Sequence, residues 1–90
     1  MKRAIKSSIN FYNIDAQAEL ATRAYELYVD DIDTLGYDTT DRDEVELDVS
    51  ECLIQAADEM GSNSVIPERI HERLLKLVIN KLRQDQILDF

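Results

Sequence analysis

The fold is decided by residues 14–35, which read IDAQAELATRAYELYVDDIDTL. Apolar side chains recur there at alternating steps of four and three residues, which is the spacing of an amphipathic helix. This seam consists of Ile14, Ala18, Ala21, Tyr25, Tyr28, Ile32 and Leu35. Leu20, Ala24 and Leu27 widen the apolar face, so we expect this helix to contact two neighbours.

A second helix is predicted over residues 42–60, with Gly61 as its stop. Its core face is formed by Val45, Val49, Cys52, Leu53, Ala56 and Met60. Residues 45, 47 and 49 also alternate as a strand would, but the helical period continues without a break to Met60. Leu47 and Ile54 lie opposite the core face. Either a further neighbour covers this helix, or these two residues form a self-association interface.

A third helix is predicted over residues 67–84, where Pro67 suits the first turn because its missing N–H costs little there. Its core face is formed by Ile70, Leu74, Leu77, Val78 and Leu82. Its opposite face is basic and carries Arg69, Arg73, Lys76, Asn80 and Arg83. Residues 85–90 are partly apolar, and we expect them to pack on the body of the domain or on a partner.

Polar residues and glycines mark the ends of these helices. Asn13 can accept hydrogen bonds as the N-cap of the first helix, and Gly36 can adopt the left-handed conformation that ends it. Thr40 or Asp41 can cap the second helix. The spacing of Asp41 and Glu44 is also that of a capping box.

Length and composition agree with a single folded domain over residues 1–90. The expected fold is all-α, a small three-helix bundle-like domain with either a short strand or an extra helix over residues 1–12. The one cysteine, Cys52, excludes an internal disulfide, and no apolar run is long enough to span a membrane. We therefore expect a cytoplasmic protein.

Negative charge is concentrated in the middle of the chain, whose formal net charge is −9. Fifteen acidic residues lie between residues 15 and 59, against only Arg23 and Arg42. The densest part is expected to bind a partner and comprises Asp30, Asp31, Asp33, Asp38, Asp41, Asp43, Glu44 and Asp48. This pattern indicates a small acidic, non-enzymatic interaction protein that binds a basic protein surface.

The charge and size suggest a sharper form of the same hypothesis. Small acidic helical proteins can imitate the phosphates of a nucleic acid and occupy the basic groove of a nucleic-acid-binding protein, as virus-encoded inhibitors of host defence do. The likeness is one of charge and size alone. The acidic and basic stripes, together with Leu47 and Ile54, also favour a homodimer.

Candidate sites for chemistry do not meet the requirements of that chemistry. Residues 31–36 begin like a calcium loop, but Arg42 stands where a bidentate carboxylate is needed. Carboxylates of the second helix, such as Asp48 and Glu51, could hold Mg²⁺ only with Glu19 or Glu26 facing them, and a solvated acidic face explains them better. We expect no metal and no cofactor.

The single histidine and the single cysteine are also expected to be structural. His71 falls within the apolar arc of its helix, where a packed ring with satisfied nitrogens is the usual state. Cys52 lies on the core face of the second helix, in acidic surroundings that do not activate a thiol. The sequence therefore predicts no catalytic residue.

The alternative function is a helix-turn-helix-like DNA-binding regulator. Residues 53–60 and 65–82 would be its two helices, and Arg69, Arg73 and Lys76 would meet phosphates or bases. Ser62 and Pro67 occupy positions that this motif fills with apolar side chains. The many acidic residues nearby also oppose DNA electrostatically, so direct nucleic-acid binding is the weaker hypothesis.

Overall fold

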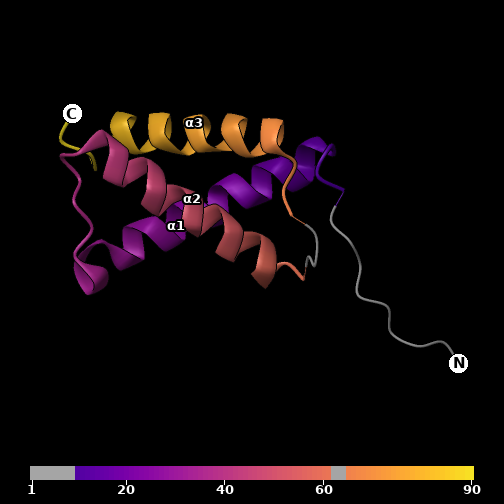
Figure 1. Ribbon diagram of the computed structural model, residues 1–90, viewed down its shortest axis with the longest axis horizontal. Helices are drawn as coiled ribbons and strands as arrows, with labels where there is room; N and C mark the ends of the chain where they lie inside the picture. The colour runs from indigo at the N-terminus through magenta and orange to yellow at the C-terminus, as the bar shows by residue number, and fades with distance from the viewer. Residues whose placement is uncertain (1–9, 62–64) are drawn as a thin grey trace, which may run out of the picture.

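The computed structural model describes residues 10–61 and 65–90, and it contains three α-helices (Figure 1). They are α1 (Ile14–Leu35), α2 (Arg42–Glu59) and α3 (Glu68–Gln84). These bounds agree with the predicted helices to within one residue, and the described ranges contain no strand. The predicted all-α, three-helix fold is therefore confirmed.

The helices begin and end at the residues that the capping rules indicate. Asn13 Oδ1 accepts from the backbone N–H of residues 15 and 16 (2.8 and 3.1 Å), and Gly36 ends α1 with a φ of 68°. Asp41 caps α2 by accepting from Asp43 N (3.0 Å). The predicted capping box with Glu44 is wrong, because the Asp41 side chain accepts from Asp43 N and not from Glu44 N.

The segment that precedes α1 is hydrogen-bonded to the helix through the buried side-chain amide of Gln17. The strand or extra helix expected over residues 1–12 falls mainly on residues 1–9, which lie outside the described residues. Of the remainder, Phe11 is buried, and its carbonyl accepts from Gln17 Nε2 (2.7 Å). Gln17 Oε1 in turn accepts from Arg73 Nη1 (3.3 Å), so both ends of this buried side chain have partners.

All three pairs of helices are in contact. In Figure 1, α1 and α2 cross as an X, and α3 lies along one side of the pair. α1 and α3 both run from right to left in this view, whereas α2 runs from left to right and crosses α1. The turn between α1 and α2 therefore lies at the same end of the molecule as the C-terminus of α3.

All three helices contribute to the core, and α2 and α3 bury most of their predicted faces. Its fully buried larger side chains are Tyr28, Leu20, Leu53, Leu74, Leu82, Val45, Val49, Val78 and Cys52. Burial of each aliphatic member contributes about 1.5–3 kcal/mol relative to exposure. Leu77 was predicted in the core but is 51% exposed, because it lies on the rim between α1 and α3.

The predicted seam of α1 is wrong at both ends. Ile14 and Leu35 are 71% and 61% exposed, and Ala18 is exposed as well. The fully buried positions of α1 are Tyr28, which belongs to the seam, and Leu20 and Ala24, which the sequence placed at the edge of the apolar face. α1 has 22 residues, more than either neighbour, so its ends extend past the helices that would cover them.

The C-terminal segment packs on the body of the domain. Leu88 is buried, and Asp89 N donates to Thr39 O (2.9 Å) while Asp89 Oδ2 accepts from Thr39 Oγ1 (2.6 Å). The Phe90 ring lies under the guanidinium groups of Arg42 and Arg83, at 5.1 and 5.8 Å. The tail therefore joins the α1–α2 turn to α3. No helix among the described residues is both long and apolar enough to cross a bilayer.

Candidate functional site

The eight acidic residues predicted to bind a partner lie at one end of the molecule, which we call the acidic end. They occupy the last turns of α1, the connecting turn and the first two turns of α2, at the left of Figure 1. Six are exposed, and Asp31 and Asp48 are half-buried. The turn brings them to the same end because only six residues separate the end of α1 from the start of α2.

Within the described part of the chain, no ion pair includes a carboxylate of the acidic end. The ion pairs there are Arg23–Glu26, Arg23–Glu59 and Lys81–Asp85, and none of them includes any of the eight carboxylates. The guanidinium groups of Arg42 and Arg83 lie over the Phe90 ring, which leaves their charges in place. Residues 30–48 contain nine acidic residues and one basic residue, Arg42, so the acidic end is a strongly negative surface.

Two of the eight carboxylates also shape the turn. Asp38 Oδ1 accepts from Thr40 N (2.9 Å) and from Thr40 Oγ1 (2.6 Å), which holds the pKa of Asp38 below its usual value. Asp41 caps α2, as described above. Asp38 stays ionised at neutral pH, and both carboxylates accept hydrogen bonds from the backbone. The charges of the turn are thus presented in a fixed conformation.

The half-buried carboxylates lie beside a cluster of two tyrosines and the cysteine. The rings of Tyr28 and Tyr37 stack with centroids 4.9 Å apart, and Cys52 is next to them. Burial raises the pKa of Asp48, and the neighbouring carboxylates of Glu44 and Glu51 raise it further. Ionisation of Asp48 therefore costs the folded state more free energy than ionisation of an exposed aspartate does.

Cys52 is a core residue without nucleophilic character. Its thiol is 1% exposed, and burial is the main reason that its pKa is raised to about 11. The charges of Asp31 and Asp48 act in the same direction. The thiol stays protonated at neutral pH, which agrees with the prediction that Cys52 packs as a small apolar side chain.

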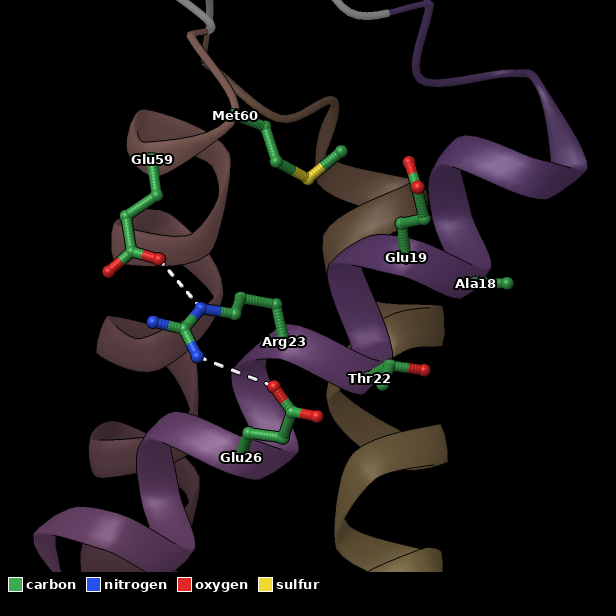
Figure 2. A pocket seen from close by; sticks show the side chains of 7 residues that line it. All are labelled: Ala18, Glu19, Thr22, Arg23, Glu26, Glu59 and Met60. Carbon is green, nitrogen blue, oxygen red and sulfur yellow. Dashed lines mark hydrogen bonds and ion pairs between the residues drawn. The ribbon is translucent and has the colours of Figure 1, made fainter.

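A groove of about 470 Å³ lies between α1 and the C-terminal end of α2, apart from the acidic end (Figure 2). Arg23 lies across it and donates from Nε to Glu59 Oε1 (2.7 Å) and from Nη1 to Glu26 Oε1 (3.3 Å). Glu19 lines the same groove. The positive charge of Arg23 is therefore paired with two carboxylates, one on α1 and one on α2.

The groove has the wrong composition for a metal centre. The guanidinium of Arg23 stands between Glu26 and Glu59, where a cation would have to bind (Figure 2). Across the part of the chain that the structure describes, no three His, Cys, Asp or Glu side chains are grouped to hold a metal ion. Residues 31–35 of the calcium-like segment are helical, and Gly36 is the end of α1.

His71 is half-buried and makes a bond that the sequence does not predict. Its Nε2 lies 2.7 Å from Ser50 Oγ, so the pair links α3 to α2. The expectation of a packed histidine with a satisfied ring nitrogen is confirmed for Nε2. Sequence reasoning could identify the position of His71 on its helix, but the pairing with Ser50 depends on how the two helices cross.

The basic stripe of α3 faces away from the core, as predicted. Its members are all exposed: Arg69, Arg73, Lys76, Asn80 and Arg83. The molecule thus carries positive charge along the outer face of α3 and negative charge on α1, α2 and the turn that joins them. Comparisons with protein-family models, with curated proteins and with solved structures found no match to this chain.

Proposed function

We propose that the protein is a non-enzymatic interaction protein whose acidic end binds a basic surface of another protein. The observation that carries the proposal is the charge of that end, where eight carboxylates gather and none joins an ion pair within the described residues. Gathering like charges destabilises a fold by self-repulsion, and a basic partner removes that repulsion. Such fields also accelerate association and exclude partners of the wrong charge.

The expected affinity follows from the number of charges. An exposed ion pair contributes about 0.2–1 kcal/mol, so eight pairs contribute about 2–8 kcal/mol. On its own, this corresponds to dissociation constants from above 1 mM down to about 1 μM. We therefore expect fast, salt-sensitive binding of moderate affinity, strengthened by apolar contacts specific to the partner.

The partner class that fits best is a protein whose basic groove normally holds a nucleic acid. The acidic end would compete there with phosphates, and the protein would act as an inhibitor. Asp38 and Asp41 support such a role, because their hydrogen bonds fix the turn before binding and lower the entropy cost of recognition. Host affinity capture with elution by a salt gradient would identify the partner.

A charge-neutralised variant tests the proposal with a defined probe, a fluorescent decaarginine peptide. The variant is Asp30→Asn, Asp33→Asn, Asp43→Asn and Glu44→Gln, all at exposed positions outside the ion pairs. The matched control neutralises four exposed acids elsewhere, and like the test set it includes two first-turn acids. It consists of Asp15→Asn, Glu19→Gln, Asp58→Asn and Glu68→Gln.

Fluorescence anisotropy should show wild-type affinity falling about tenfold or more between low and physiological salt. The test variant should bind about tenfold more weakly than wild type, and the control should lose about threefold or less, since its charges lie farther from the peptide. Salt-independent binding, or an equal loss in both variants, would contradict the proposal.

Direct DNA binding through α3 is a second candidate, favoured by the outward-facing Arg69, Arg73 and Lys76. The connection between α2 and α3 opposes it, because eight residues separate Glu59 from Glu68, whereas a helix-turn-helix uses about three or four. A gel shift with the three basic residues changed to alanine separates the two functions. If α3 binds DNA, wild type should shift the DNA band and the triple alanine variant should not.

A further inference from the structure

A groove of about 630 Å³ runs between α1 and α3, separate from the acidic end. The buried side chains of Ala21 and Val78 lie at its base. Small residues, Ala18 and Thr22, line the α1 wall, and the half-exposed Leu77 stands on the α3 wall. The groove therefore has an apolar base, an α1 wall that is low at Ala18 and Thr22, and one large apolar side chain, Leu77, in contact with solvent.

The two walls carry opposite charges. Glu26 lies on the α1 wall and Lys81 on the α3 wall, and both line the groove. Their ion pairs within the chain are at the surface, with Arg23 (3.3 Å) and Asp85 (3.7 Å) respectively. Exposed pairs of this kind contribute little and leave both charges available to a partner.

We propose that a second copy of this chain packs on the groove, with a two-fold axis that runs along the groove, midway between the directions of α1 and α3. A rotation about that axis preserves height along the groove and exchanges the two walls. The acidic α1 wall of each copy then faces the basic α3 wall of the other, so Glu26 lies opposite Lys81 of the second copy. Leu77 is placed over the low wall formed by Ala18 and Thr22 of that copy.

The charge pattern selects this occupant and this axis. A two-fold axis across the groove would place each acidic wall on its equivalent, which electrostatics disfavours. The same objection applies to pairing through Leu47 and Ile54, because Glu51 and Asp58 follow them by four residues and lie beside them on α2. Of these two apolar surfaces, only the groove is self-complementary in charge.

The area of the surface formed by α1 and α3 sets the expected affinity of dimerisation. α3 has 17 residues and is about 25 Å long, and two adjacent helices are about 20 Å wide. The two copies together would bury about 1,000 Å², the low end for specific interfaces. We therefore expect dimerisation in the micromolar range, independently of the function proposed for the acidic end.

The first test is sedimentation equilibrium of wild type from about 10 to about 500 μM, which brackets the expected range. Leu77→Gln should weaken dimerisation at least tenfold. Its matched control, Leu47→Gln with Ile54→Gln, should not weaken it, although it also removes exposed apolar side chains. A wild-type monomer throughout, or dissociation by the control and not by Leu77→Gln, would overturn the proposal.

The second test exchanges the charges of the two walls. Glu26→Lys and Lys81→Glu should each weaken dimerisation, because both symmetry-related contacts become repulsive. The double variant should dimerise again, and so should an equimolar mixture of the two single variants. Circular dichroism of each variant reports its fold. Failure of both the double variant and the mixture to recover dimerisation, with folded chains, would refute the proposed axis.

Discussion

Removal of the Tyr28 hydroxyl is expected to stabilise the protein. The Tyr28 side chain is fully buried, and its hydroxyl has no hydrogen-bond partner among the described residues. Folding therefore removes this group from water without compensation. Phenylalanine keeps the ring and its stacking on Tyr37 and omits only the polar atom. Tyr28→Phe thus removes the cost of burying an unpaired hydroxyl and preserves the packing of the ring.

The magnitude follows from the cost of an unsatisfied buried group, about 1–3 kcal/mol. Loss of some van der Waals contact reduces the gain, so we expect about 1–2 kcal/mol for Tyr28→Phe. In a domain of this size, 1 kcal/mol corresponds to about 4–8 °C in Tm. The variant should therefore melt at least about 4 °C above wild type.

The stabilisation by Tyr28→Phe should be larger in alkaline solution. Burial is the main reason that the pKa of Tyr28 is raised to about 12 from its ordinary value of 10. Because the folded state disfavours the phenolate, the stability contributed by neutral Tyr28 is present below pH 10 and is lost as the pH rises through 12. Tyr28→Phe lacks this loss, so its advantage over wild type should widen by up to about 2–3 kcal/mol.

Thermal and urea denaturation followed by circular dichroism measure both effects. Tyr25→Phe is the matched control, because the Tyr25 hydroxyl donates a hydrogen bond to Asp85 Oδ2. That substitution should lower the stability by about 0.5–1.5 kcal/mol. A lower Tm for Tyr28→Phe, or equal losses in the two variants, would show that the Tyr28 hydroxyl has a partner in solution and would refute the reasoning.

Three further substitutions test local features by thermal denaturation. Asp48→Asn should raise the Tm by about 1–3 °C near pH 7, because it removes a partly buried charge and relieves a like-charge pair with Glu44. The raised pKa of Asp48 means that wild type loses stability as pH rises through that pKa, so the gain should vanish below about pH 3 and a constant gain would contradict the electrostatic cause. Gly36→Ala should cost about 1 kcal/mol from its φ of 68° alone, since no atom lies within 4 Å of the added Cβ, and an unchanged Tm would show that the turn relaxes. Asp41→Ala should cost about 1 kcal/mol by removing the cap of α2, whereas Asp41→Asn should be nearly neutral, and equal losses would assign the effect to charge.

The sequence was sufficient for the helices because each is encoded locally. Periodic apolar positions, Asn13 and Gly36 mark α1 with no reference to the rest of the chain. The depth of burial is not local, since it depends on where neighbouring helices end. The seam therefore fails at Ile14 and Leu35, which satisfy the period but lie beyond the helices that cover the middle of α1.

The same distinction applies to the candidate sites. The acidic end was predictable, because a short turn necessarily places the acids that flank it at one end of the domain. Contacts between helices were not, such as Arg23 with Glu59 and Ser50 with His71, which are 36 and 21 residues apart. Leu77 belongs to this second group, since only the separation between α1 and α3 decides whether its side chain is covered or lines a groove.

The bond from Asp89 N to Thr39 O makes one backbone amide a reporter for a distant segment. This amide can exchange its hydrogen with solvent only when the C-terminal segment separates from the α1–α2 turn, so the two segments, 50 residues apart in sequence, share one opening event. A ligand that rigidifies the turn would slow exchange at Asp89 without touching it. Hydrogen exchange at that position can therefore detect occupancy of the acidic end before any partner is identified.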